Sequence, residues 1–411
     1  MAAAVDTFNN ILYKIDEYED LEIQEAIIAS LQNKKNIERQ QLMFEQDLEY
    51  VIALSMQDKN ESEKKESVVI MKTIKEDPYE NIKQLTKEEL PAHIGALTSA
   101  FMHHQDGKPN NYYDLLHSHY WISGQLAWMI SERTSVPFVH TMHTMAKVKN
   151  RSLAEDEKSE PLVREIGEMQ LVETASALIA NTDAEASSLI SLYGANPEKV
   201  NVIAPGVDLI QFSKADGKAK TRERLKIAPD AMMISFVGRI QPHKGPEVLV
   251  KAVGEILRSW PELRSKLALV IMGDNSGSGH NELEKLRNLA KFLQVEDVIH
   301  FIPPVKRSDL PDWFRASDLV CVPSYSESFG LVALEAQACG TPVVASAVGG
   351  LRTAGSDGIS GVLVDGHDPI AWAATIAKLL IDPTRREMLS QGAIAHAKNF
   401  SWNMTAKKTL E

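Results

Sequence analysis

Short apolar segments of strand length alternate with amphipathic helical patterns from about Val68 onward, and this alternation constrains the fold more than any other feature. Strands joined by helices in this order predict parallel, doubly wound sheets, which bind ligands in the crevice at the carboxyl ends of their strands. A connection near Asp208–Gly217 divides the pattern into two such sheets with a cleft between them. The expected strands are Val68–Met71, Leu115–His117, Phe138–His140, Leu178–Asn181, Val200–Ala204, Met233–Val237, Leu267–Met272, Val298–Ile302, Leu319–Pro323, Pro342–Ser346 and Gly361–Val364.

Residues 1–66 have a different texture, with 15 acidic and 7 basic side chains and neither Gly nor Pro. Two helical patterns, Leu21–Gln32 and Leu42–Asp58, precede a polar linker at Asn60–Ser67. The sequence therefore predicts three parts: a helical segment over 1–66, a first Rossmann-like domain over 67–208 and a second over 209–411.

Several functional classes are disfavoured by composition. The sequence has no apolar run near the roughly 18 residues of a membrane span, and Met1–Asn10 lacks the basic and apolar regions of a signal peptide. The two cysteines, Cys321 and Cys339, predict buried thiols rather than a disulfide framework, which favours a reducing cytoplasm. The sequence has no concentrated basic region, so we do not expect nucleic acid as a partner.

Two carboxylates stand eight residues apart after the expected strand Leu319–Pro323. Glu327 lies in the loop, a helix opens at Ser328-Phe329-Gly330, and Glu335 lies within that helix. Backbone N–H groups at a helix start attract phosphate, while carboxylates accept hydrogen bonds from sugar hydroxyls. This combination suits a nucleotide-sugar, although helix-face carboxylates are common when taken alone.

Two cations follow the first strand of the second sheet. The segment Phe236–Pro246 contains Gly238, Arg239 and Lys244, with Pro246 placed for the first turn of a helix. Arg239 and Lys244 can direct positive charge at a diphosphate. Alone, such residues are mostly solvated charges, but together with the two carboxylates they form a specific pattern.

These segments resemble the donor site of retaining glycosyltransferases of the GT-B fold, family four. From about Asp77 to Thr405 the chain is similar to the D-inositol-3-phosphate glycosyltransferases of mycothiol biosynthesis. The resemblance implies two Rossmann-like domains facing a cleft, and a UDP-sugar-dependent hexosyltransferase. The further supporting segments are Thr86–Pro91, His117–Gln125, His140–Thr144 and Val148–Asn150.

The resemblance also implies the site residues. Arg239 and Lys244 hold the UDP diphosphate, Glu335 binds the ribose, Glu327 binds the GlcNAc hydroxyls, and uracil meets the main chain near Val305. His143 lies near the reacting carbon, so the catalytic set is Arg239, Lys244 and His143. The donor-binding set is Gly238, Arg239, Lys244, Val305, Glu327, Phe329, Gly330, Leu331 and Glu335, and the acceptor-binding set is Lys87, Tyr120, Thr144 and Arg164.

The implied reaction uses no cofactor beyond the UDP-sugar co-substrate. A Mg²⁺ ion beside the diphosphate is compatible with this reaction. His117, His119, His140 and His143 flank two strand ends, but they lack the spacing of a zinc motif, so we expect no metal site. The resemblance implies retention of anomeric configuration by front-face displacement, without a protein nucleophile.

The chain departs from this family before Val68, where no glycine occurs and hence no Gly-rich phosphate loop is expected. We therefore expect a truncated first domain. The region in its place resembles tandem ubiquitin-interacting motifs, at Glu19–Leu31 and Asp47–Met56, with Ala26 on the same helix face as Ser30 and Val51 where alanine is usual. A plain acidic amphipathic helix pair is the alternative interpretation.

Three hypotheses follow. The first is a glycosyltransferase that moves GlcNAc from UDP-GlcNAc to an inositol phosphate or a similar polyol. The second is a ubiquitin-binding protein, acting through residues 19–57, that carries an inactive glycosyltransferase remnant. The third is a family-four transferase with another nucleotide-sugar and acceptor.

Overall fold

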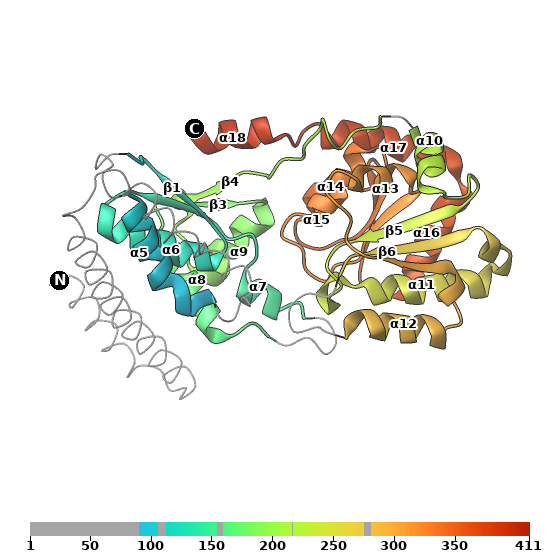
Figure 1. Cartoon of the computed structure of the whole chain (residues 1–411), viewed down its shortest axis with the longest axis horizontal. Helices are drawn as coiled ribbons and strands as arrows, with labels where there is room; N and C mark the ends of the chain where they lie inside the picture. Colours follow the sequence, from blue (N-terminus) through green and yellow to red (C-terminus); the bar gives the residue numbers. More distant parts are fainter. Residues whose placement is uncertain (1–89, 106–111, 154–158, 216, 275–280) are drawn as a thin grey trace, which may run out of the picture. The chain divides into compact units, whose positions relative to one another are not determined.

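The computed structural model of the chain describes residues 90–105, 112–153, 159–215, 217–274 and 281–411 (Figure 1). Within these residues, those up to His140 together with Pro161–Ala177 form one compact unit, and Thr141–Glu160 with Leu178–Glu411 form another. The expected strand Val68–Met71, the two N-terminal helices, the ubiquitin-interacting motifs and Lys87 lie outside the described residues. Their assignments, and the domain boundary expected near residue 208, stay predictions.

The first sheet has four strands in the order β1-β2-β3-β4. Three of its strands fall within a residue or two of the expected bounds, and β4 ends two residues early. The strands are β1 (Leu116–His119), β2 (Phe138–Thr141), β3 (Ala177–Ala180) and β4 (Val200–Val202). The helices of this region are η1 (Leu90–His93), α5 (Ile94–Gln105), α6 (Trp121–Thr134), α7 (Ala146–Asn150), α8 (Leu162–Thr174), α9 (Asp183–Tyr193) and η2 (Pro197–Lys199).

Local chemistry sets the ends of α9. The Thr182 side chain accepts a hydrogen bond from the backbone N–H of Glu185, which satisfies one of the donors left open at a helix start. Gly194 ends the helix with φ of 69°, a left-handed conformation that glycine adopts without strain. α9 therefore begins and ends where its capping residues dictate.

The second sheet has six strands in the order β10-β9-β8-β5-β6-β7, and every recorded pairing is parallel. This confirms the predicted doubly wound parallel sheet. The first strand, β5, lies in the middle, so the chain order reverses between β5 and β8, the position where open α/β sheets bind ligands. The strands are β5 (Met232–Val237), β6 (Leu267–Met272), β7 (Ile299–Ile302), β8 (Leu319–Val322), β9 (Val343–Ser346) and β10 (Gly361–Val364).

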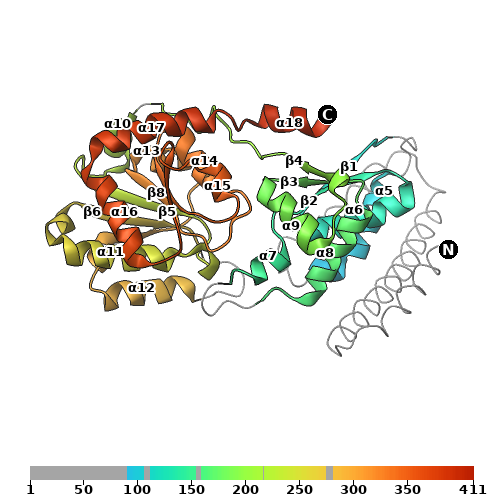
Figure 2. The ribbon, with the colours of Figure 1, turned by 180° about the vertical axis from the view of Figure 1, so that it is seen from behind.

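Helices cover both faces of the second sheet, with α11 and α12 on one side and α13 and α14 on the other (Figures 1 and 2). The helices are α10 (Gly217–Leu225), η3 (Pro242–Lys244), α11 (Pro246–Ser259), η4 (Pro261–Ser265), α12 (Glu282–Phe292), η5 (Glu296–Val298), α13 (Leu310–Ala316), α14 (Leu331–Ala338), α15 (Leu351–Ala354), α16 (Pro369–Ile381), α17 (Pro383–Ala397) and α18 (Trp402–Leu410).

The apolar residues of β8 show how this sandwich is filled. Leu319 and Cys321 join the core layer shared with α11, α12 and α16, whereas Val320 and Val322 join the layer shared with α13, α14 and α15. Successive side chains of a strand point to opposite faces, so a strand covered on both sides is apolar throughout. Cys321 and Cys339 are free, buried thiols, as predicted, and burial raises the pKa of both.

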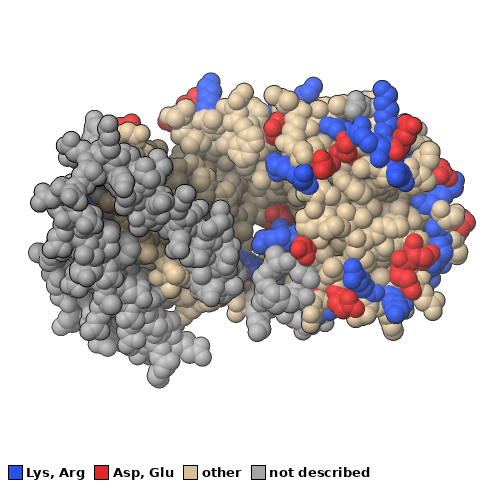
Figure 3. All heavy atoms as spheres, viewed as in Figure 1, with Lys and Arg blue, Asp and Glu red and all other residues tan. Residues whose placement is uncertain are grey.

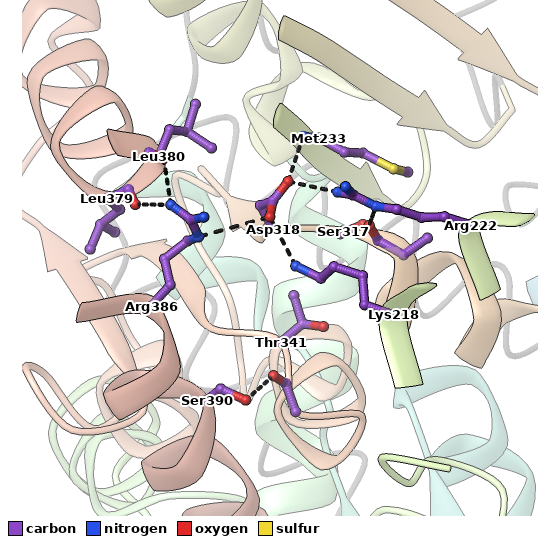
Figure 4. A network of polar contacts seen from close by, with 12 residues as sticks. Lys218, Arg222, Met233, Ser317, Asp318, Thr341, Leu379, Leu380, Arg386 and Ser390 are labelled. Carbon is purple, nitrogen blue, oxygen red and sulfur yellow. Dashed lines mark hydrogen bonds and ion pairs between the residues drawn. The ribbon is translucent and has the colours of Figure 1, made fainter. Parts of the chain in front are cut away.

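At the amino end of β8, the buried carboxylate of Asp318 is surrounded by cations (Figure 4). It accepts hydrogen bonds from Lys218 Nζ at 2.9 Å, Arg222 Nη2 at 2.8 Å and the Met233 backbone N–H at 2.8 Å, and Arg386 Nε lies 3.8 Å away. Burial pushes the pKa of Asp318 up, but Lys218, Met233 and Arg222 outweigh it and hold the pKa below its usual value. We name Asp318, Lys218, Arg222 and Arg386 the Asp318 cluster.

The surface of the second unit carries both signs of charge. Figure 3 shows Lys and Arg interspersed with Asp and Glu on the part of this face that belongs to the second sheet and its helices. Among the helices that the structure describes, none combines the length and apolarity needed to cross a membrane.

Candidate active site

The loops that follow β5 and β8 meet at the switch point of the second sheet. Both strands run in the same direction, with Ile234 opposite Leu319, so their carboxyl ends lie at one edge. A cavity of about 270 Å³ lies there, and all its lining residues belong to the second compact unit. The lining residues are His143, Asn181, Pro205, Phe236, Val237, Gly238, Lys244, Cys321, Val322, Ser324, Glu327, Ser328, Phe329, Gly330, Leu331, Val332 and Trp402.

An ion pair joins the two loops. Lys244 Nζ lies 2.6 Å from Glu327 Oε2, and the hydroxyl of Ser324 donates to the same oxygen at 3.2 Å. The side chains of Lys244 and Glu327 keep 21% and 18% of their surface exposed, so both remain within reach of a ligand in the cavity. The structure thus brings together a predicted diphosphate cation and a predicted sugar-binding carboxylate, separated by 83 residues in sequence.

The backbones of neighbouring loops approach each other closely at two glycines. Gly245 has φ of 66°, and a Cβ atom there would lie 2.2 Å from the carbonyl oxygen of Pro323. A Cβ atom at Gly350 would lie 2.1 Å from the carbonyl oxygen of Ser328, and the Gly350 N–H donates to the Glu327 carbonyl at 2.8 Å. Only glycine allows these approaches, which hold the Glu327 loop on both sides.

The start of α14 contributes backbone donors to the cavity. Gly330 precedes the helix with φ of 102°, and Leu331 is its first residue, with 40% of its surface exposed. The Phe329 side chain is buried, and its ring centroid lies 5.7 Å from that of Phe400. Phe329 therefore anchors the turn, while the open N–H groups and positive dipole end of α14 suit a phosphate.

Glu335, one turn into α14, is buried and paired with a cation that sequence reasoning missed. Arg307 Nη2 lies 2.8 Å from Glu335 Oε1, and the Arg307 guanidinium lies 5.2 Å from the centroid of the Phe212 ring. Burial raises the pKa of Glu335, and Arg307 opposes this rise. Val305 lies half-buried two residues before Arg307. The position of Arg307 in the loop after β7 was the sequence signal that could have indicated this cation.

Positive charge gathers around His243, between the two predicted diphosphate cations. Arg239 is exposed, and His243 precedes Lys244 in η3. Burial, followed by the positive charges of Lys244, Lys149 and Arg239, lowers the pKa of His243 to about 3. Of the predicted donor residues, Arg239, Val305 and Glu335 lie outside the lining of the cavity.

Two of the predicted acceptor residues lie together in the first compact unit. The Arg164 guanidinium lies 5.0 Å from the centroid of the Tyr120 ring, and Arg164 Nε donates to Glu168 Oε1 at 2.7 Å. Arg164 and Glu168 are both buried. Tyr120 has φ of 71° and ψ of 149°, a region that residues other than glycine rarely adopt and that is often found at functional sites.

His143 and Thr144 follow β2, and both are exposed. His143 has a left-handed φ of 58°, so it is a second predicted site residue with a strained backbone. The Thr144 N–H donates to the Met142 carbonyl at 2.7 Å, which closes a tight turn under His143. The chain leaves β2 through this turn, and His143 within the turn lines the cavity.

The histidines near the strand ends of the first sheet contact one another and a neighbouring hydroxyl. The rings of His117 and His119 lie 4.1 Å apart, and burial, followed by the charge of His119, lowers the pKa of His117 to about 4. His140 Nδ1 lies 2.8 Å from the hydroxyl of Ser118. Within the ranges that the structure describes, no three His, Cys, Asp or Glu side chains gather as metal ligands.

Comparison with known proteins agrees with this geometry. Residues 80–211 match the family model described as Glycosyltransferase Family 4, and residues 217–396 match Glycosyl transferases group 1. The chain is 51% identical over 342 residues to a D-inositol 3-phosphate glycosyltransferase from Kineococcus radiotolerans, covering 81% of this chain and 78% of the relative. It is 49% identical to a protein of the same name from Kribbella flavida, with 83% and 80% covered.

Among solved structures, a sucrose-phosphate synthase from Thermosynechococcus elongatus matches with a TM-score of 0.71 and 28% identity, covering 79% of this chain and 78% of that one. Both sheets, the switch-point loops and these relatives agree in one assignment. The chain therefore belongs to the group 1 glycosyltransferases, enzymes of the GT-B fold.

Proposed function

We propose that the chain transfers GlcNAc from UDP-GlcNAc to an inositol phosphate, with retention of anomeric configuration. The observation that carries this proposal is the 51% identity to a relative named D-inositol 3-phosphate glycosyltransferase over 78% of that relative's length. The polar groups at the switch point support it, because they offer cations and carboxylates within one edge of a sheet.

The donor residues divide by the chemistry of their partners. Lys244 and Arg239 hold the diphosphate together with the amino end of α14, since each supplies positive potential. Glu327 accepts hydrogen bonds from sugar hydroxyls, and Glu335 accepts from the ribose. The main chain at Val305 meets the uracil. The 2.6 Å contact between Lys244 and Glu327 supports this division, since a cation for phosphate and a carboxylate for hydroxyls lie next to each other.

The acceptor residues would recognise an anionic polyol. Tyr120, Thr144 and Arg164, with Lys87, provide hydroxyl and cationic groups for a phosphate. Arg164 Nε donates to Glu168, which fixes the orientation of the guanidinium. His143 lies at the reacting carbon of the donor sugar. The strained backbone of Tyr120 and of His143 supports a functional role for both.

The reaction needs no protein nucleophile. The acceptor hydroxyl oxygen forms a bond to the anomeric carbon while the bond from that carbon to the diphosphate oxygen breaks. The hydroxyl proton passes to the departing phosphate oxygen, and UDP leaves. Lys244 and Arg239 stabilise the negative charge that develops on the diphosphate, so the protein contributes positioning and electrostatics.

Release of UDP by the purified full chain from UDP-GlcNAc, with and without inositol 3-phosphate, tests this function. We expect release that depends on the acceptor. Faster release of UDP from another UDP-sugar would show that this sugar, and not GlcNAc, is the one transferred. Absence of release, with UDP binding intact, would contradict the proposed transfer. Titration of EDTA in the same assay would show whether Mg²⁺ contributes.

A further inference from the structure

His367 lies in the turn after β10, outside the lining of the donor cavity, and contacts the loop that carries Glu327. Its Nε2 lies 3.1 Å from the carbonyl oxygen of Ser324 and 3.1 Å from the hydroxyl of Ser346. Ser324 follows β8 and Ser346 ends β9, and both are buried. One imidazole nitrogen therefore links the carboxyl ends of two strands.

Tyr325 connects the same loop to the Lys244 segment. Its ring is stacked on the His367 ring, with centroids 3.8 Å apart and planes at 13°. Its backbone N–H donates to the His243 carbonyl at 2.8 Å, and its hydroxyl donates to Glu247 Oε1 at 3.2 Å. Glu247 is the second residue of α11, and this helix begins directly after the glycine that follows Lys244. Tyr325 is thus held by three different elements.

The turn that carries His367 is itself fixed. Gly366 has φ of 72°, and its carbonyl accepts a hydrogen bond from Trp372 Nε1 at 3.1 Å. Trp372 is fully buried in the core, and the Asp368 side chain accepts from the backbone N–H of Ile370 at the start of α16. His367 therefore contacts the Glu327 loop from a support that the hydrophobic core immobilises.

We propose that His367, acting with Tyr325, is a positioning residue that sets the location of Glu327 relative to Lys244. The inference rests on the proposed role of Glu327 at the donor sugar. His367 holds the Ser324 carbonyl, three residues before Glu327, and the Ser324 hydroxyl contacts Glu327 Oε2. Tyr325 ties that loop to the segment of Lys244. Loss of His367 would displace the sugar-binding carboxylate while leaving the nucleotide contacts in place.

The test compares affinities for UDP and UDP-GlcNAc, by calorimetry, with turnover in the full chain. In His367→Ala we expect turnover to fall on the order of 10- to 100-fold, because small displacements of a positioned group cost that much. Affinity for UDP-GlcNAc should fall by a larger factor than affinity for UDP. His367→Gln keeps an N–H donor within reach of the Ser324 carbonyl and should recover most of the loss.

His396→Ala is the matched control. His396 Nε2 also contacts a backbone carbonyl, that of Thr353 at 3.2 Å, and its ring packs on Phe400, but it contacts neither donor loop. We expect wild-type turnover from this variant. If His367→Ala does not fold, Tyr325→Phe keeps the ring and removes the hydroxyl that contacts Glu247, and it should show the same pattern with a smaller loss.

Unchanged turnover in folded His367→Ala would overturn the inference, as would an equal loss of UDP and UDP-GlcNAc affinity or a Gln variant no better than Ala. A wild-type chain that binds both nucleotides without turnover would remove the proposed transfer, while the affinity comparison would still decide the role of His367. Absence of UDP binding by the wild-type chain would contradict both.

Discussion

The amino ends and the carboxyl ends of the strands in the second sheet each hold a carboxylate that is paired with a cation, but the two carboxylates are surrounded differently. At the amino edge, Asp318 receives Lys218, Arg222 and a backbone N–H, and Arg222 also donates to the carbonyls of Ala316 and Pro229. At the carboxyl edge, Glu327 receives Lys244 and a hydroxyl from its own loop.

This difference separates structure from function in one sheet. The polar groups of the Asp318 cluster contact other protein groups, and these belong to α10, α13, β5 and the start of α17. The cluster therefore connects these helices and this strand. The Lys244–Glu327 pair is partly exposed and lines a cavity, so a ligand can exchange for either partner. Removing a residue should therefore reduce stability at one edge and turnover at the other.

The largest effect is expected at Asp318. Asp318→Ala leaves Arg222 buried without its counter-charge, and breaking such a buried pair costs about 3–5 kcal/mol of the free energy of unfolding. Denaturant titration measures this cost. Asp297→Ala, which removes an exposed partner of Arg264, should cost less than about 1 kcal/mol. An equal effect of the two substitutions would erase the proposed distinction between the edges.

Lys244→Ala and Glu327→Ala should instead act on the reaction. Loss of Lys244 removes a group that stabilises developing charge and should lower turnover by about 10²- to 10³-fold. Loss of Glu327 removes the carboxylate that positions the sugar and should lower turnover by about 10²-fold. Because both side chains are partly exposed, the denaturation midpoint should stay close to that of the wild-type chain. The UDP-release assay measures the expected loss of turnover, and unfolding curves measure the expected unchanged stability. Retained turnover in either variant would refute the donor-site assignment.

Arg307→Ala should give an intermediate effect. Without Arg307, the buried Glu335 carboxylate loses the charge that opposes its raised pKa, so the pKa rises further. UDP affinity should fall about tenfold, the value of a charge-assisted hydrogen bond. The loss should grow as pH decreases, because protonated Glu335 is a poorer acceptor. Arg307→Lys keeps the charge and should recover part of the affinity; a pH-independent loss would exclude this explanation.

The smallest effect concerns His243. Its pKa of about 3 lies below the ordinary value of 6.5, so between these values the unfolded chain binds a proton that the folded chain does not. His243 therefore lowers stability as pH falls from about 6.5. Lys244→Ala removes a neighbouring positive charge and should raise the pKa of His243, which NMR titration of the imidazole would detect. An unchanged pKa would mean that the charge of Lys244 does not contribute to the lowered pKa of His243.

Sequence reasoning succeeded where burial is continuous and failed where contacts are distant. β6 and β10 have the bounds expected from their apolar runs, and β5 and β9 differ by one residue at one end, because both faces of this sheet are covered. β1 is shifted along the chain because it alternates leucine, histidine and serine, a weak strand pattern. Periodicity reports burial, and here burial is the dominant determinant of strand position.

The motifs of the candidate site could be identified from the sequence, but the residues that hold those motifs in place could not. The motifs that contain Lys244 and Glu327 lie in one doubly wound unit, and their combination assigned both residues to a single donor. Arg307 and His367 were missed because their partners, Glu335 and Tyr325, lie on other elements, and only the observed register brings them together. Pairings of this kind leave no periodic signal in a single sequence.

The close backbone approaches at Gly245 and Gly350 have a consequence for how this site can evolve. Any side chain at either position would collide with a carbonyl oxygen of the neighbouring loop. A single substitution at either glycine would therefore disturb both loops at once. New donor preferences must arise at positions that face the cavity without supporting it, such as Ser328 and Leu331. The backbone of the loops around the cavity would then be inherited unchanged, while the side chains that face the cavity vary from one lineage to the next.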